Sequence, residues 1–556
     1  MKADTPTLVL RNGRIWSPTA PSGFAASMAM SGARIVAIGD DAEVAELCTP
    51  QTEVVDLAGR LAIPAFGDAH IHAIGGGLES LRCDLVGVRG RHAIIETVAA
   101  WVDSLPPGAW VTGGGWEMAA FPGGTPTKED LDAVTGGRPA FLPNRDHHSA
   151  WVNSVALDMA GIDELTPDPA DGRIERDKDG SPTGCLHDGA MALVARLLGR
   201  PSADELAAGL RAALAKLHSL GITHFQDACV GSAAELGLMD TFDAYVAAAS
   251  EGWLTAQVRG ALWWDRRRGV EQIDDLLTRR EAASAGAFRA TSAKVMMDGV
   301  CETFTAAMGS PYLGEPGCGG THRGELFISP EEAAAAVAVL DDEDFQVHFH
   351  AIGDRAVSTA LDAIEALPAE RRHVGRHHLA HLQFISPRDL GRFRQLGVVA
   401  NFQPLWAAND PQMQELTIPF VGPERADWQY SIGSVAAAGG HVAFGSDWPV
   451  SSPDPLQEIH VAVNRVRSAR AGEPGTPECE MPFRPSEAMS VAASLAAFTS
   501  GVAFVNGTED SLGTLAEGYR ADVAVLDQDL FEIAPSGIGD TSVEMTIAGG
   551  RVVHGS

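Results

Sequence analysis

The chain has 556 residues, of which 45% are hydrophobic and 21% are charged, and its formal net charge is -32. This length is enough for a large core, either in several domains or in one wide α/β barrel with an accessory domain. Nucleic-acid binding needs clusters of Lys and Arg, so the acidic balance argues against a nucleic-acid partner and against binding to an anionic membrane surface.

The cysteine pattern points to a reducing compartment. Seven cysteines are scattered along the chain, and none belongs to a CxxC pair. This usage indicates neither a disulfide framework nor a cysteine-type zinc site. The N-terminal residues contain no apolar stretch of signal-peptide length, and no apolar run approaches the length of a membrane span. We therefore expect a cytoplasmic protein without a membrane partner.

The two ends of the chain share one sequence pattern. Short apolar runs alternate with Gly and Asp turns over residues 7–60, and the same pattern returns after residue 520. Such alternation is typical of short β-strands. We expect residues 1–60 and 506–556 to form one small β-sandwich domain.

The middle of the chain, residues 61–505, alternates short apolar strands with Ala-, Leu- and Arg-rich helical stretches, such as residues 233–250. This alternation predicts parallel strand pairing and favours a (β/α)8 TIM-like barrel. Residues from about 95 to 210 fit the repeat poorly, and the segment 172–184 is typical of a hairpin. We therefore expect an insertion there. The candidate strands lie within residues 61–63, 221–228, 291–299, 345–353, 376–383, 397–404 and 441–449.

Polar residues gather where the candidate strands end. Residues 61–63 are followed by Asp68, His70 and His72. Alternate residues of a strand face the same side, so His70 and His72 can point together into the mouth of a barrel. Imidazole is a common zinc ligand, but an HxH motif alone is weak evidence for a metal.

Three further candidate strands carry the same residue types at their ends. They supply His348 and His350, then His377, His378 and His381, and finally Asp447. Four strand ends that bring His or Asp to one rim favour a metal site over four separate local hydrogen bonds. The spacing does not choose between His348 and His350, which share a face.

Lys294 stands out because Lys is rare in this chain. Lys and Arg number 41 together, and Lys294 is the Lys that lies in an apolar candidate strand. A buried amine can lose its proton, which a guanidinium cannot. A neutral amine can react with CO2 to give a carbamate, an oxygen ligand able to bridge two metals. The alternative is a buried ion pair, for example with Asp298.

These segments resemble the amidohydrolase superfamily, and more narrowly its YtcJ-like branch, which includes N-substituted formamide deformylases. The segments are GDAHIH, SAKVMMDGV, HFHAIGDRA, RHHLAHLQ and FGSDWPV. The resemblance spans nearly the whole chain and departs from the family pattern at residues 64–67. It favours His350 over His348, and it implies a carboxylated Lys294. The metal ligands that it implies are His70, His72, Lys294, His350, His381 and Asp447.

The resemblance also implies a hydrolase with one or two divalent ions, zinc first. Such an ion lowers the pKa of bound water to about 7. Asp447 is the expected proton acceptor and donor, and His381 is the second catalytic candidate because a nearby histidine can polarise the carbonyl. We expect a small neutral N-substituted amide as substrate, with formamides first. Hydrolysis of a cyclic amide, lactone or ester, deamination, and a non-enzymatic barrel protein stay open.

Five residues are candidates for substrate binding. They are Trp116, His148, Asp298, Glu302 and Trp406. The tryptophans can form aromatic walls, although Trp116 can equally pack inside a surface loop. His148 matches a family histidine near the mouth of the site, and Glu302 either binds a polar substrate group or caps a helix. The expected partner is a small molecule, and the sequence leaves the oligomeric state open, a homodimer included.

Overall fold

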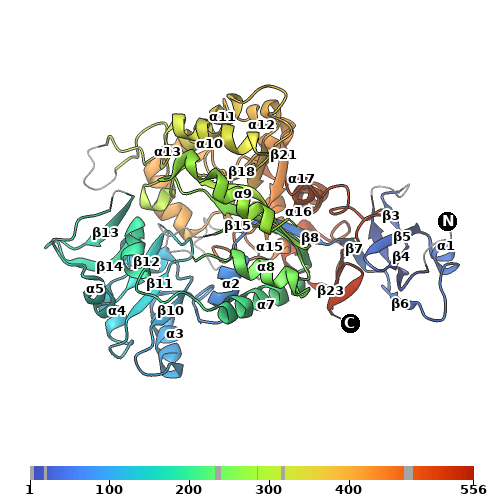
Figure 1. Ribbon diagram of the computed structural model, residues 1–556, viewed down its shortest axis with the longest axis horizontal. Coiled ribbons are helices and arrows are strands. Elements are labelled where there is room, and N and C mark those ends of the chain that lie inside the picture. Colours follow the sequence, from blue (N-terminus) through green and yellow to red (C-terminus); the bar gives the residue numbers. More distant parts are fainter. Residues whose placement is uncertain are drawn as a thin grey trace.

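Figure 1 shows the computed structural model, which describes residues 5–17, 22–169, 171–231, 239–284, 286–314, 320–468 and 480–555. Its centre is an eight-stranded sheet in which all neighbouring strands run parallel. In sheet order the strands are β8 (Phe66–Ile71), β15 (Ile222–Val230), β16 (Gln257–Trp263), β17 (Phe288–Met296), β18 (Gln346–Ala351), β19 (His378–His381), β20 (Val399–Phe402) and β21 (His441–Phe444). The predicted α/β class with a parallel barrel is therefore confirmed.

The barrel closes where the first strand, β8, meets the segment that follows the last strand, β21. The backbone N–H of Asp447 donates to the carbonyl of His70 at 2.7 Å, and that of His72 donates to the carbonyl of Trp448 at 2.8 Å. Gly445 permits this approach, since a Cβ there would lie 2.5 Å from the backbone nitrogen of His70. The two segments that carry His70 and Asp447 are thus held against each other by the backbone.

Helices surround the barrel, and the sequence explains how the longest of them begin. α7 (Ala203–Ser219) and α10 (Pro330–Asp342) each start with a capping box, formed by Ser202 in one and Ser329 in the other. Their apolar faces belong to the main hydrophobic cluster. The other helices of this region are α2 (Ala73–Ser80), α8 (Phe242–Ser250), α9 (Ile273–Ala282), α11 (Asp354–Glu365), α12 (Arg392–Leu396), α13 (Ile418–Ala426), α14 (Ile432–Ala437), α15 (Pro455–Asn464), α16 (Val491–Phe498) and α17 (Ser500–Val505).

Two further sheets contain the strands from the chain ends, which lie together on one side of the barrel (Figure 1). A four-stranded sheet has the order β5-β4-β1-β6, with β1 (Leu8–Arg11), β4 (Ser27–Ser31), β5 (Arg34–Gly39) and β6 (Glu53–Asp56). A six-stranded sheet has the order β24-β23-β22-β7-β2-β3, with β2 (Arg14–Trp16), β3 (Phe24–Ala25), β7 (Leu61–Pro64), β22 (Val523–Leu526), β23 (Val543–Ala548) and β24 (Arg551–His554).

The strand at residues 61–63 is not the one that carries the histidines. This segment is β7, which pairs with β2 and β22 in the six-stranded sheet. The barrel strand β8 begins two residues later, at Phe66, and includes Asp68 and His70 within it. The two strands follow each other so closely that the apolar run of the sequence does not separate them.

The insertion forms a third sheet on the opposite side of the barrel from the end sheets (Figure 1). Its order is β13-β14-β12-β11-β10-β9, with β9 (Cys83–Asp84), β10 (Val111–Gly114), β11 (Ala140–Pro143), β12 (Ser149–Val152), β13 (Gly172–Arg176) and β14 (Pro182–Asp188). The antiparallel pair of β13 and β14 confirms the hairpin predicted at 172–184. This sheet begins earlier than the expected insertion, and α7 is part of the barrel region.

Three smaller expectations can be compared with the structure. Of the helix expected at 233–250, residues 233–238 lie outside the described residues, and the described helix is α8. Cys318 and Cys479 also lie outside them, and the five described cysteines are free thiols. Among the described residues, no helix combines the length and the apolar character needed to cross a membrane.

Candidate metal centre and substrate cavity

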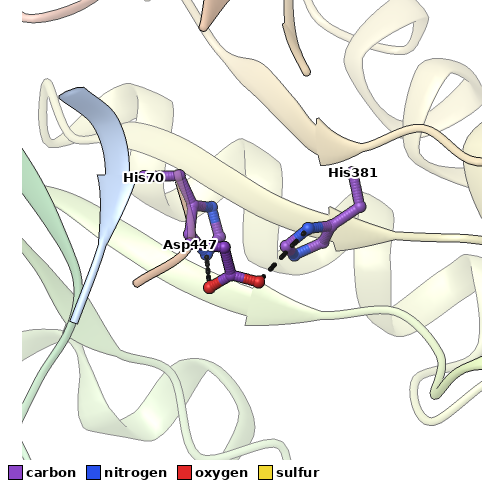
Figure 2. Close-up of side chains that lie close together, drawn as sticks. All are labelled: His70, His381 and Asp447. Atoms are coloured by element: carbon purple, nitrogen blue, oxygen red, sulfur yellow. Dashed lines mark ion pairs between the residues drawn. The ribbon is translucent and has the colours of Figure 1, made fainter. Parts of the chain in front are cut away.

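The carboxyl ends of the barrel strands bring His70, His381 and Asp447 together (Figure 2). One ligand atom from each lies within 4.8 Å of the others, and all three residues are buried. Asp447 Oδ1 lies 3.3 Å from His70 Nε2, and Asp447 Oδ2 lies 3.8 Å from His381 Nδ1. His72 joins them, since its Nε2 lies 3.2 Å from Asp447 Oδ1.

The backbone at two of these residues is strained. His381 has φ +77° and Asp447 has φ +56°, and left-handed backbone is uncommon outside glycine. Each residue lies where its strand ends, so the left-handed turn helps set the direction in which the side chain leaves the barrel rim. Strain of this kind is found where function requires an exact side-chain position.

Unsatisfied polar atoms indicate that the group of three fits a metal ion. His381 Nδ1 and Asp447 Oδ1 are buried and make no hydrogen bond within the part of the chain that the structure describes. A buried polar atom without a partner is costly, and a cation bound between these atoms would remove that cost. Imidazole nitrogen and carboxylate oxygen are also the donors that zinc and similar divalent ions use. The residues present therefore fit the metal.

The protonation states suit this role. Burial, aided by the charge of Lys294, lowers the pKa of His70 to about 3. Burial likewise holds the pKa of His350 and of His381 well below the ordinary value. Burial alone would raise the pKa of Asp447, but the surrounding histidines hold it well below its ordinary value. At neutral pH the site therefore presents neutral imidazoles and a carboxylate, the forms that bind metal.

Lys294 lies in β17 beside this group and is buried, with an exposed fraction of 3%. Its Nζ is 3.5 Å from His70 Nε2. Burial lowers the pKa of Lys294 to about 8. Lys294 does not form the ion pair with Asp298 that the sequence left open. Asp298 accepts backbone N–H groups instead.

The two histidines of β18 have different surroundings. His350 lines the cavity at the barrel mouth, and its ring centroid is 4.5 Å from that of His381. His348 lies deeper in the barrel, where its Nε2 is 2.8 Å from His70 Nδ1 and its Nδ1 is 2.6 Å from Gln226 Oε1. His348 therefore orients the His70 ring from behind. The geometry favours His350 as the residue that faces a ligand.

The other two histidines near β19 lie away from the cavity. His377 Nδ1 accepts from the backbone of Val347, and its Nε2 lies 3.3 Å from Asp341. His378 Nδ1 lies 3.2 Å from the side-chain nitrogen of Asn401. Of the three histidines in this segment, His381 alone lines the cavity.

A cavity of about 160 Å³ opens over the candidate metal site. Its walls are mostly apolar and include Leu78, Trp263, Met296, Val300, Trp406 and Val450. The Trp406 ring stacks on His381 at 5.3 Å with an interplanar angle of 5°, which fixes the orientation of that imidazole. A ligand in this cavity would therefore contact apolar side chains while one end faced the histidines.

His148 lines the same cavity and carries a positive charge. Its Nδ1 is 2.6 Å from Asp188 Oδ1, which leaves Nε2 for a ligand. Burial alone would lower the pKa of His148, but the charge of Asp188 and the hydrogen bond to it raise the pKa to about 9. The result is an imidazolium next to His350, with a ring-to-ring distance of 5.8 Å.

The remaining substrate-binding candidates lie in three different places. Trp116 is 0% exposed in the core of the insertion, where its indole N–H donates to the carbonyl of Leu142. Asp298 is buried, and its two oxygens accept backbone N–H groups from Ile352, Gly353 and Ala307. Neither residue lines the cavity over the metal site. Glu302 lines a second, adjacent cavity.

Comparison with known proteins identifies the family. A profile of the Amidohydrolase family matches residues 53–554, which is most of the chain.

The chain belongs to the amidohydrolase family.

Similar proteins cover nearly the full length of this amidohydrolase. The putative amidohydrolase YtcJ of Bacillus subtilis is 29% identical over 91% of this chain and 91% of its own. The N-substituted formamide deformylase of Arthrobacter pascens is 26% identical over 98% of this chain and 97% of its own. The crystal structure of a metal-dependent hydrolase from Pyrococcus furiosus matches with a TM-score of 0.69 and 28% identity, covering 94% of this chain and 99% of that one. The resemblance to YtcJ-like amidohydrolases is thus confirmed.

Two supporting residues of this amidohydrolase were not predicted. Asp68 accepts from the backbone N–H of His70 and from both the N–H and the hydroxyl of Ser446, so it joins β8 to the segment that carries Asp447. Asp188 is separated from its partner His148 by 40 residues, and the pairing of β12 with β14 brings the two together. Asp68 lies within β8 and Asp188 is the last residue of β14, so an acidic residue inside an apolar strand was the available signal in both cases.

Proposed function

We propose that this amidohydrolase is a metal-dependent enzyme that cleaves the C–N bond of a small N-substituted amide, with formamides as the first candidates. The observation that carries the proposal is the convergence of His381 Nδ1 and Asp447 Oδ1 beneath a mostly apolar cavity, since both atoms are buried and make no hydrogen bond among the described residues. The similarity to the N-substituted formamide deformylase supports the choice of substrate.

The metal would be held by six residues, and zinc is the first candidate. A divalent ion bound there activates water and polarises the amide carbonyl. Nitrogen and oxygen ligands of this kind also bind manganese and iron ions. The residues are His70, His72, Lys294, His350, His381 and Asp447. His348 would position the His70 ring through the 2.8 Å contact at Nδ1, which leaves Nε2 for the metal.

Lys294 would contribute as a carbamate. A free ammonium 3.5 Å from His70 Nε2 would repel a metal cation at that site. The lowered pKa of about 8 raises the fraction of neutral amine, which attacks CO2. A nitrogen–carbon bond forms and the nitrogen loses a proton, so the positive side chain becomes a negative oxygen donor.

Asp447 would transfer the proton. Its pKa is held well below the ordinary value, so the residue is a carboxylate at neutral pH. It would accept a proton as water attacks the amide carbonyl, and would deliver this proton to the nitrogen of the departing amine. The backbone hydrogen bond from Asp447 to His70 keeps the carboxylate in position during both transfers.

His148 would stabilise the charge that develops on the carbonyl oxygen. The imidazolium can donate from Nε2, since Nδ1 is held by Asp188. Preorganised donors of this kind in a water-poor site give large stabilisation of the transition state. His381 also lines this cavity, and stacking on Trp406 fixes the orientation of its ring.

The two end sheets are proposed to form one β-sandwich domain, attached to the barrel with its insertion. Support comes from a hydrophobic cluster that joins Leu10 and Met28 to Val523, Val525 and Ile547. Because β7 pairs within these sheets, the proposed first boundary moves from residue 60 to residue 64. The second boundary stays near residue 506.

The proposal is tested with a panel of formamides, esters and amino-substituted heterocycles on the zinc-loaded enzyme and on Asp447→Asn. We expect the wild type to turn over formamides, and the variant to lose at least about 100-fold in kcat, the usual scale for an acid–base group. Free amine release is measured directly. Turnover confined to esters or heterocycles would contradict the assignment of substrate, and an unimpaired Asp447→Asn variant would contradict the assignment of the base.

A further inference from the structure

A second cavity of about 70 Å³ adjoins the cavity over the metal site. The two share several lining residues, among them Asp146, Ile352 and Trp406. Trp406 thus lines both cavities, and its ring stacks on His381. A ligand whose reactive group lay near the histidines could extend past Trp406 into this second space.

The positive groups that line the second cavity already have acidic partners. Arg467 binds Asp410 Oδ2 at 2.6 Å. Arg145 binds Glu117 Oε1 at 2.9 Å and also donates to the carbonyl of Val450. These cations are therefore neutralised within the protein.

The remaining acidic groups are not paired in this way. Glu302 accepts a hydrogen bond from Thr417 at 2.9 Å, and Asp146 accepts one from the backbone N–H of His148 at 3.0 Å. Neither carboxylate forms an ion pair with a residue that the structure describes. Burial, together with the charge of Asp146, raises the pKa of Glu302 to about 7.

Two buried neutral side chains each have one oxygen without a hydrogen bond in the described part of the chain. Tyr430 lines the cavity with an exposed fraction of 3%, and its hydroxyl makes no hydrogen bond within the described part of the chain. Gln383 is equally buried and donates its side-chain N–H to Gln429 at 3.1 Å, which leaves its Oε1 without a partner there. Oxygens in a cavity without a protein donor are available to accept a hydrogen bond from a ligand.

We propose that this second cavity binds a positively charged nitrogen at the far end of the substrate, which makes the substrate an amide of a diamine. The inference rests on the proposed function, because the amide must lie at the metal site. Two carboxylates, an amide oxygen and a phenol oxygen together offer acceptors to the N–H groups of one ammonium ion. The ring face of Trp406 could also attract the ammonium group by a cation–π interaction.

The chemistry of the two cavities agrees with such a substrate. The first is mostly apolar and suits the uncharged amide and an alkyl linker. The second supplies negative charge at a distance from the metal, so the ammonium is kept away from the bound cation. An uncharged alkyl group in the second cavity would leave Glu302 and Asp146 without a charged partner there.

The test compares mono-N-formyl diamines with N-formyl alkylamines of the same length, in which a methyl group replaces the ammonium. We expect kcat/KM to be at least about tenfold higher for the diamine derivative at the best chain length. Glu302→Gln, which keeps the side-chain shape, should reduce this ratio to near one. Glu517→Gln is the matched control, because Glu517 is exposed and distant in sequence from both cavities, and it should leave the ratio unchanged.

Binding of an unformylated diamine, measured by calorimetry, separates the two claims. Weaker binding in Glu302→Gln than in wild type is expected. Diamine binding that depends on Glu302, without hydrolysis of any formamide, would overturn the proposed function and leave the cation site standing. Hydrolysis of both substrates with equal kcat/KM, or an unchanged ratio in Glu302→Gln, would overturn the cation site and leave the proposed function standing.

Discussion

At the scale of single residues, Lys294 is the most unusual group of the site. It is a buried lysine with a lowered pKa, 3.5 Å from an imidazole that would bind the metal. Arg would keep its charge in the same place, and Ala would remove the amine altogether. The two substitutions therefore distinguish a role for the amine from a role for positive charge.

We predict that Lys294→Arg and Lys294→Ala both lose metal and activity together. In wild type loaded with 13C-labelled CO2, carbon NMR should detect a carbamate signal that both variants lack. Added short carboxylates should partly restore Lys294→Ala, because they supply the missing oxygen ligand. An active, metal-loaded wild type without a carbamate signal would refute this part of the account.

The pair of His148 and Asp188 makes a second residue-scale prediction, which concerns pH. Because the pKa of His148 is raised to about 9, the protonated form is present at neutral pH and is lost as the pH rises through that value. We expect kcat/KM for a formamide to fall on the alkaline side for this reason.

Asp188→Asn should move this alkaline limb to lower pH, since it removes the charge that raises the pKa. Asn has nearly the same shape as Asp, so the substitution should keep the fold at residue 188, whose backbone has φ +47° and ψ -124°. A pH–rate profile of the two proteins is the measurement. An alkaline limb at the same pH in both would show that His148 is not the group that titrates.

Much of the site was predictable at this scale, and the reason is local. His70, His381 and Asp447 follow or end apolar strands, so their side-chain types and the parallel fold were enough to place them at one rim. Asp188 was not predictable, because its role depends on a pairing between strands 40 residues apart. The sequence allows Trp116 either to form an aromatic wall of the substrate pocket or to pack within its own segment. Its indole packs in the core of the insertion, and only tertiary contacts distinguish the two.

At the scale of elements, the site depends on how β8 meets the segment after β21. Asp68 holds this junction with one contact to β8 and two to Ser446. All three partners are donors, so a carboxylate satisfies them and an amide nitrogen cannot. Asp68 therefore closes the barrel and does not line the cavity over the metal site.

We predict that Asp68→Asn lowers the free energy of unfolding by about 1–3 kcal/mol, the cost of leaving buried partners unsatisfied. Metal affinity should fall as well, because His70 and Asp447 would lose their fixed separation. Chemical denaturation and competition with a chelator measure the two effects. Asp103→Asn on the exposed face of α3 (Arg91–Ser104) is the control, and an Asp68→Asn protein as stable as this control would contradict the assignment.

The order of strands also shows where the sequence is ambiguous. The alternation of strands and helices was sufficient to predict the parallel barrel. It was not sufficient to separate β7 from β8, because a single residue, Ala65, lies between them and both are buried. Their partners differ, and partner choice is decided by distant segments such as β22.

At the scale of the whole molecule, the described residues form four sheets, and two of them, in the barrel and in the insertion, supply the site. The barrel presents the candidate metal ligands, the insertion supplies His148 and Asp188 at the cavity, and the end sheets lie on the other side (Figure 1). The net charge of -32 gives the molecule a field that draws cations toward it, which agrees with a dication at the metal site and with a cationic substrate.

The most direct test of the central claim is the divalent-metal content of the purified protein, measured together with formamide turnover before and after chelation. The account predicts at least one equivalent of metal per chain, loss of turnover when the metal is removed, and recovery when zinc is returned. A metal-free protein that hydrolyses formamides at the full rate would contradict it.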